Sequence, residues 1–292
     1  MNNDLLVNAY TQYHQSKLDF NAGREFSQIL QRAGLFDESL ALELYFRSEN
    51  ESVFAFQREP WTNRRCVVSL TPPVNAQFGD LWLDPVEVNV AVFVPNRPES
   101  SQQGIGWISR HPVQVWQFCT FLKLVRKGAS RTEFPFPTDY LSSERFQGLS
   151  STLFATNVYH DEAIAYAVWF GKWLTSRLDL GNARRYLRAE EFRDLLPENM
   201  RLWDGSLDRE ELRLAIGRDC LEKLPEDDIQ MLLRGEKLPQ PDRMVYGEWE
   251  RSPSIGFSSV VHSALTIDRL KKSYTSYFDL ENTALNLSEE QA

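Results

Sequence analysis

Cysteine and histidine are scarce in this chain, and neither is arranged in a motif. The 292 residues include three cysteines and four histidines, with no Cys-x-x-Cys pair and no His-x-His or His-x-x-x-His spacing. Widely spaced thiols suit a reducing compartment better than a disulfide framework. A zinc or iron site would have to be assembled from residues distant in the sequence. The sequence therefore predicts no disulfide scaffold, no local metal motif and no cofactor.

Long apolar runs are also lacking. No stretch approaches the roughly 20 apolar residues of a membrane helix, and residues 1–10 have neither the basic start nor the apolar core of a signal peptide. Acidic residues outnumber basic ones, 41 to 32, so the formal net charge is −9. A field of that sign repels phosphate backbones. We therefore expect a cytoplasmic protein for which a membrane partner is excluded and nucleic acid is disfavoured.

Apolar and aromatic side chains are plentiful. Hydrophobic residues make up 42% of the chain and include eight tryptophans, enough for a large packed core. Residues 4–47 carry helical periodicity interrupted at Gly23 and Gly34, which predicts two or three short helices. Residues 66–70 and 86–94 are rich in β-branched residues and bounded by prolines, which predicts strands.

These patterns predict an α+β fold in three parts. A helical extension covers residues 1–59, a mixed body covers residues 60–280, and a polar acidic tail covers residues 281–292. Within the body, a charged segment over residues 206–238 is predicted to be helical.

Two segments of the body combine polar and aromatic residues in a distinctive order. Residues 108–118 read ISRHPVQVWQF, and we expect a strand to end at Arg110 and Pro112 to lie in the first turn of a helix. Residues 156–170 read TNVYHDEAIAYAVWF, where Ala163 and Ala167 would allow close approach along one side of a second helix.

In this order, the two segments resemble signatures of the formylglycine-generating-enzyme (sulfatase-modifying-factor) family. Two weaker similarities follow in the family's order: YLRAEEF at residues 186–192 and MVYGEW at residues 244–249, with a remnant of the closing motif at residues 255–257. The resemblance implies an irregular α+β domain related to C-type lectins. The framework residues that it implies are Ile108, Trp116, Phe118, Phe121, Asn157, Val158, Asp161, Ala163, Tyr166, Trp169, Glu190, Phe192 and Trp249.

The chain departs from this family at its catalytic centre. The family's enzymes carry a copper-binding cysteine pair in their C-terminal part, whereas this chain has no cysteine after Cys220. Other side chains do not replace a thiolate as a ligand of the soft cuprous ion. The resemblance therefore implies a scaffold without catalytic residues.

Several titratable residues are candidate sites. His160, Asp161 and Glu162 are adjacent, but neighbours on a helix point in different directions, which favours a role at the helix start. Tandem carboxylates at a helix start are usually solvated, so Glu190 and Glu191 are expected to lie on the surface. Cys119 lies in an apolar helix and is expected to be an inert buried thiol. The short basic clusters, Arg184-Arg185 with Arg188 and Lys271-Lys272, are expected to be solvated surface.

The sequence favours a non-catalytic accessory or adaptor protein that binds a protein partner. A peptide or small-molecule ligand is left open. The alternative is a metal-dependent oxidase or oxygenase of changed chemistry on the same scaffold. One of the two additions to the family domain, residues 1–59 or 206–238, is predicted to form the partner interface. The residues predicted for it in the second addition are Leu212, Ile216, Leu221, Ile229, Leu232 and Leu233.

Overall fold

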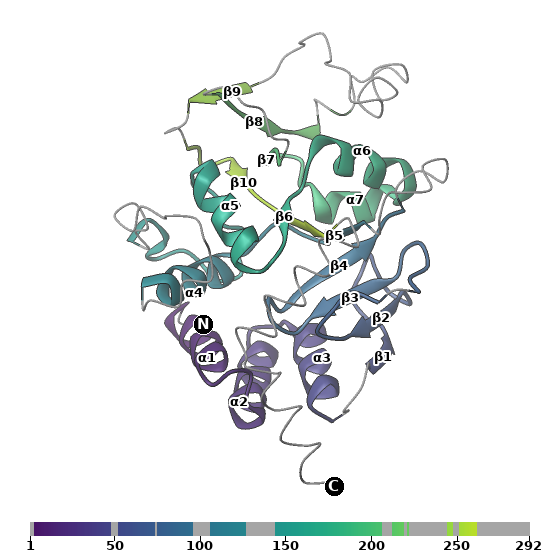
Figure 1. The fold of residues 1–292 in the computed structure, drawn as a ribbon, viewed down its shortest axis with the longest axis vertical. Coiled ribbons are helices and arrows are strands. Elements are labelled where there is room, and N and C mark those ends of the chain that lie inside the picture. Colours follow the sequence, from purple (N-terminus) through teal and green to yellow (C-terminus); the bar gives the residue numbers. More distant parts are fainter. Residues whose placement is uncertain are drawn as a thin grey trace, which may run out of the picture.

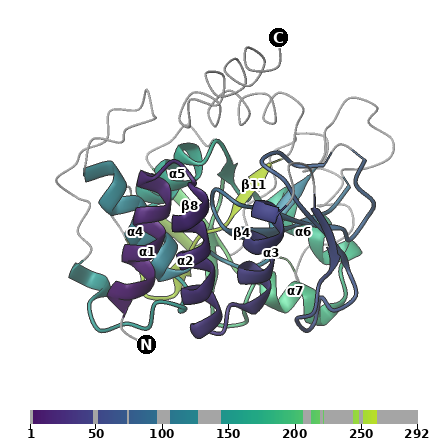
Figure 2. The same cartoon turned by 90° about the horizontal axis from the view of Figure 1, so that it is seen from below.

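The computed structural model describes residues 3–47, 52–73, 75–95, 106–126, 144–205, 212–218, 221, 244–247 and 251–261. Three helices come first: α1 (Asn3–Gln15), α2 (Phe20–Arg32) and α3 (Phe36–Arg47). They lie side by side across one side of the molecule (Figure 2). This confirms the helical prediction for residues 4–47.

The two glycines in this region behave differently. Gly34 follows α2 with φ +78°, a left-handed conformation that ends the helix and that glycine adopts without steric cost. Gly23 lies inside α2, so the prediction of a break there is wrong. Its missing side chain makes room for the ring of Phe46 on α3, because a Cβ atom at Gly23 would overlap that ring. The tertiary contact between two helices, and not a turn, explains this glycine.

A seven-stranded sheet forms the centre of the molecule, in the order β1-β2-β3-β4-β5-β11-β6. All neighbours are antiparallel except β2 and β3, which are parallel. The strands are β1 (Ser52–Ala55), β2 (Arg65–Val68), β3 (Leu81–Asp84), β4 (Asn89–Phe93), β5 (Trp107–Ser109), β11 (Ser259–Val261) and β6 (Trp173–Leu174).

The strand predictions hold in part. Strand β2 confirms the prediction for residues 66–70, whereas only β4 forms within residues 86–94, because Val88 at φ +52° belongs to the turn that precedes it. Strand β3 was not predicted. All four of its residues are buried, so it lacks the apolar–polar alternation by which a half-exposed strand is recognised.

A four-stranded sheet lies at the end of the molecule opposite the N-terminal helices (Figure 1). Its order is β10-β7-β8-β9, formed by β10 (Ile255–Gly256), β7 (Arg201–Trp203), β8 (Leu212–Ile216) and β9 (Met244–Gly247). The helical prediction for residues 206–238 is therefore wrong at β8. Its alternating sequence LRLAI is typical of a strand, and β7 and β9 pair with its backbone on both sides.

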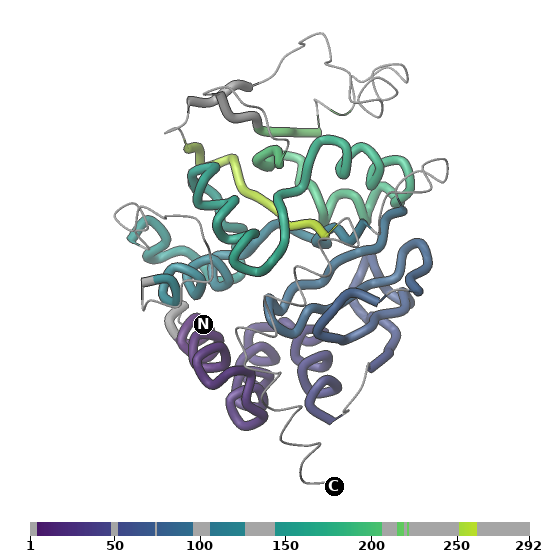
Figure 3. Tube along the Cα trace, in the orientation of Figure 1, coloured from purple at the N-terminus to yellow at the C-terminus, as the bar shows by residue number. Residues whose placement is uncertain are grey.

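Among the described residues, four further helices cover the sheets: α4 (Val115–Arg126), α5 (His160–Trp169), α6 (Arg177–Tyr186) and α7 (Ala189–Leu195), with a 3-10 turn, η2 (Glu144–Phe146), between the first two. Helix α4 begins at Val115, so Pro112 precedes the helix and does not lie in its first turn as predicted. Residues 255–261 then run from the four-stranded sheet into the seven-stranded one, where β11 lies between β5 and β6 (Figure 3).

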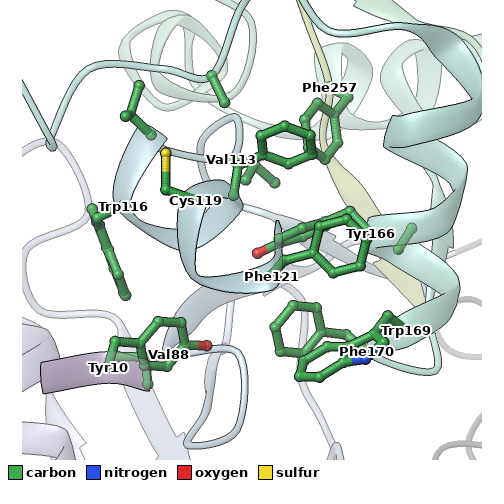
Figure 4. Packing of buried hydrophobic residues seen from close by; sticks show 14 of the residues in the cluster. Tyr10, Val88, Val113, Trp116, Cys119, Phe121, Tyr166, Trp169, Phe170 and Phe257 are labelled. Atoms are coloured by element: carbon green, nitrogen blue, oxygen red, sulfur yellow. The ribbon is translucent and has the colours of Figure 1, made fainter. Parts of the chain in front are cut away.

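The N-terminal helices share their core with the body. Tyr10 of α1 packs 4.8 Å from the ring centre of Trp116 on α4 and donates a hydrogen bond of 2.7 Å to the carbonyl oxygen of Val86 (Figure 4). Tyr13 donates a hydrogen bond of 2.9 Å to the carbonyl oxygen of Pro85. Among the described helices, none has the length and apolar character needed to cross a membrane.

Candidate functional site

A buried ion cluster lies where β3, the turn before β4 and the residues after α5 meet. The ammonium group of Lys172 lies 3.0 Å from the carboxylate of Asp84 and also contacts that of Glu87, and all three side chains are almost fully buried. The same ammonium group lies 5.0 Å from the ring centre of Trp82. One cation between two carboxylates leaves a formal charge of −1 inside the protein.

Neutral polar side chains extend this cluster across the sheet. Ser259 of β11 donates to Glu87 at 3.4 Å and bonds with Ser109 of β5 at 2.8 Å, and Asn89 of β4 donates to Ser109 at 3.1 Å. Burial alone would lower the pKa of Lys172, but Asp84 and Glu87 raise it above its ordinary value. The amine therefore stays protonated, which makes it a structural cation and a poor nucleophile.

A second ionic cluster joins α3 to the body. Arg110, which follows β5, has its Nη2 atom 3.6 Å from Glu38 and its guanidinium 4.8 Å from the ring centre of Phe56. Its Nε and Nη1 atoms are buried without a hydrogen-bond partner. Arg58 contacts the other oxygen of Glu38 at 3.5 Å. Burial lowers the pKa of Arg110, while Glu38 and Asp194 oppose that shift.

The residues His160, Asp161 and Glu162 do not converge on one site, although His160 Nδ1 lies 3.5 Å from a carboxylate oxygen of Asp161. Glu162 is buried, accepts the backbone N–H of Tyr159 at 2.9 Å and pairs with Arg145 at 2.5 Å. His160 points instead to the carbonyl oxygen of Asp204, at 3.2 Å. Burial raises the pKa of Glu162 even though Arg145 opposes the shift. These contacts anchor the start of α5.

The two adjacent carboxylates on α7 also lie in different environments. Glu190 is exposed, whereas Glu191 is fully buried between Arg64 and Arg188, each of which donates from Nε at 3.0 Å. Burial alone would raise the pKa of Glu191, but the hydrogen bonds from Arg188 and Arg64 lower it. The expectation that both carboxylates are solvated is wrong for Glu191.

We expect Glu191→Gln to destabilise the fold by about 2 kcal/mol at neutral pH, because it removes charge-assisted hydrogen bonds to two arginines. The folded-state pKa is lowered, so the contribution is present above the unfolded pKa and is lost as the pH falls through the folded pKa. Denaturant unfolding at neutral and acidic pH measures both effects. Glu190→Gln is the matched control and should change little at either pH. A difference that persists undiminished in strong acid would contradict this account.

Two of the three thiols are described. Cys66 and Cys119 are buried, and burial raises the pKa of Cys66 well above its ordinary value. The prediction of burial is confirmed for Cys119. Cys220 lies outside the described residues. Within the part of the chain that the structure describes, no three His, Cys, Asp or Glu side chains gather closely enough to hold a metal ion.

Most of the predicted framework residues are core residues. Asn157, at φ +59°, forms the turn before α5, whereas Asp161 and Glu190 are exposed. Trp249 lies outside the described residues. The buried members are Ile108, Trp116, Phe118, Phe121, Val158, Ala163, Tyr166, Trp169 and Phe192.

Two of the partner residues predicted in the second addition are buried. Ile216 and Leu221 are 3% and 4% exposed and belong to the core. Leu212 lies in β8 and pairs with Gly247. The remaining three residues, Ile229, Leu232 and Leu233, lie outside the described residues.

Most of the large exposed apolar side chains lie instead in the first addition. Of eight among the described residues, five lie within residues 1–59. The eight are Leu5, Phe20, Phe36, Leu40, Val53, Phe78, Leu149 and Leu153. Phe36 is 60% and Leu40 38% exposed, and their spacing of four residues places both on one face of α3.

Sequence reasoning missed the two buried ionic clusters. Lys172 and Glu87 are 85 residues apart, so no local spacing in the sequence predicts their contact. One local signal in the sequence does point to a buried ion pair: Lys172 is a charged residue inside an apolar stretch, between Phe170 and Trp173. Such a residue is buried only with a partner.

Comparison with known proteins identifies no relative: no family model, no curated protein and no solved structure matches the chain.

Proposed function

We propose that this chain is a non-catalytic accessory or adaptor protein that holds a protein partner on its N-terminal helices. The exposed apolar face of α3, Phe36 and Leu40, carries the proposal. Single exposed apolar residues are ordinary on protein surfaces, but two large ones on one helix face are typical of a docking helix. Full burial of such a side chain stabilises a complex by about 1.5–3 kcal/mol.

The second part of the proposal is that the body is a formylglycine-generating-enzyme-like scaffold, and the packing of its core supports this. Three segments that resemble the family's signatures meet in one cluster: Tyr166 lies 5.5 Å from Phe121 and 5.2 Å from Phe257, between ring centres (Figure 4). Lys172 and Glu191 each form internal ion pairs with two side chains, which favours a structural role for their charges.

The test compares two double variants in partner binding. Phe36→Ser with Leu40→Ser should weaken binding of a captured and identified partner roughly tenfold or more, since two anchors are lost. Leu149→Ser with Leu153→Ser, equally exposed but on the body, is the matched control and should bind normally. Both should unfold at the wild-type temperature, because exposed residues contribute little to stability.

Hydrogen exchange with and without the partner locates the contact independently. Protection is expected in α3 and its neighbours. Protection confined to the body, with normal binding by the α3 variant, would overturn the docking proposal. Stoichiometric iron or zinc in the isolated protein, lost in His111→Ala or His160→Ala, would support the oxidase or oxygenase alternative instead.

A further inference from the structure

The turn between β3 and β4 contains a strained residue. Val88 has φ +52°, in the left-handed region that a β-branched residue adopts only at a cost in free energy. Its side chain is buried in the same core cluster as Tyr10 of α1 (Figure 4). A conformation of this kind persists only where the surrounding contacts hold it. The contacts of residues 84–88 show what holds this one.

Two helices bind the backbone of this turn. Tyr13 and Tyr10 of α1 donate hydrogen bonds of 2.9 and 2.7 Å to the carbonyl oxygens of residues 85 and 86. Gln117 of α4 places its side-chain nitrogen 3.4 Å from the carbonyl oxygens of residues 87 and 88. Each carbonyl oxygen of residues 85–88 therefore accepts a hydrogen bond from a side chain of a distant segment.

The buried ion cluster holds the same turn through its carboxylates. Lys172 pairs with Asp84 at the start of the turn and with Glu87 within it. Asp84 also accepts the backbone N–H of Val86 on its carboxylate at 2.8 Å, and that of Val88 on its carbonyl oxygen at 2.7 Å. The lysine therefore fixes the side chains around which the backbone of the turn is folded.

The strain at Val88 links these contacts to one another. If the contacts that hold the turn are lost, Val88 gains free energy by returning to the extended region. That rotation moves the carbonyl oxygens beside it, so the hydrogen bonds from α1 and the ion pairs to Lys172 are weakened together. Contacts that depend on one shared backbone conformation are not additive.

We propose that residues 85–88 form a strained latch, through which the buried ion cluster around Lys172 controls how tightly α1 is held on the body. When the cluster is broken, the turn relaxes and no longer presents its carbonyl oxygens to Tyr10 and Tyr13. The latch is a property of the fold, and it does not depend on the docking of a partner on α3.

A double-mutant cycle tests the coupling in the full-length chain. Tyr10→Phe removes only the hydroxyl group, and the shift that it causes in the urea transition midpoint is measured in wild type and in Lys172→Met. The shift should shrink by roughly half or more in Lys172→Met, because the turn no longer holds the acceptor in place. Glu191→Gln, in a separate ionic cluster, is the matched background and should leave the shift unchanged. An equal shift in all three backgrounds would overturn the proposal.

A milder change in the cluster keeps the cycle usable if Lys172→Met does not fold. Glu87→Gln removes one charge of the cluster and keeps the shape of the side chain. It should also reduce the shift caused by Tyr10→Phe, and an unreduced shift in this background counts against the latch.

Substitutions of Val88 test the strain. Val88→Gly and Val88→Ala both remove the isopropyl group, but only glycine adopts φ +52° without steric cost. Val88→Gly should therefore unfold at a higher urea concentration than Val88→Ala. At Val90, a buried residue of β4, the order should be reversed, because glycine weakens an ordinary strand. If Val88→Ala is the more stable of its pair, the turn is not strained and the latch is wrong.

Hydrogen exchange shows where a broken cluster is felt. In Lys172→Met or Glu87→Gln, the backbone amides of α1 should exchange faster than in wild type by a larger factor than those of α7, because α1 is held by the turn. Equal acceleration in the two helices, or acceleration confined to β3 and β4, would contradict the coupling.

Discussion

Replacing Lys172 by methionine is expected to destabilise the folded protein by about 3–5 kcal/mol, the usual cost of breaking a buried ion pair. The ammonium group lies against two carboxylates, Asp84 and Glu87, and all three side chains are almost fully buried. Without the lysine, two like charges remain uncompensated in the interior. Urea unfolding at neutral pH measures the loss as a lower transition midpoint.

Two further variants separate the electrostatic cause from packing. Lys123→Met, at a partly exposed lysine on α4 that bonds to Asn8 at 2.8 Å, is the matched control and should stay within about 0.5 kcal/mol of wild type. Adding Glu87→Gln to Lys172→Met should restore part of the stability, because one buried charge is removed with the lysine. A Lys172→Met protein as stable as wild type would contradict the ion-cluster account.

Replacing Tyr10 by alanine is expected to cost about 3–5 kcal/mol, as for other buried aromatic residues. Tyr10 is fully buried against Trp116, Phe26 and His14, and its hydroxyl group satisfies the carbonyl oxygen of Val86 in the body. Tyr10→Phe keeps the ring and loses only that hydrogen bond, so it should cost about 1 kcal/mol. Thermal and denaturant unfolding measure the loss of stability in both variants.

The same contacts predict that the N-terminal helices cannot be removed. A chain lacking residues 3–47 would expose the face of Trp116 against which Tyr10 and Phe26 pack, and it should lose cooperative unfolding. Gln12→Ala, at an exposed position of α1, is the point-mutation control and should be close to neutral. A truncated protein that unfolds cooperatively at the wild-type temperature would show that the helices are an independent addition.

Local patterns predicted the elements that depend on neighbours in the chain. The N-terminal helices follow from apolar spacing and from turn residues such as Gly34, and β2 follows from a short β-branched run between prolines. Helix α5 begins where the polar residues at 160–162 place carboxylates in its first turn. These signals act over a few residues, so they need no knowledge of the rest of the fold.

Position in the fold decided the rest. The segment LRLAI at β8 fits a helix or a strand by composition, and pairing with β7 and β9 selects the strand. The sequence predicts a helix break at Gly23. In the structure Gly23 is a packing contact, because the ring of Phe46 on another helix lies against it.

The sequence by itself determined an α+β chain with a helical start, buried aromatic residues and no local catalytic or metal motif. Only the tertiary structure decided which side chains meet: Lys172 with Asp84 and Glu87, Glu191 with Arg64 and Arg188, and Phe78 with Tyr186 of α6. Spacing along the chain carries no information about such pairs, since their energy depends on distance and burial in the folded state.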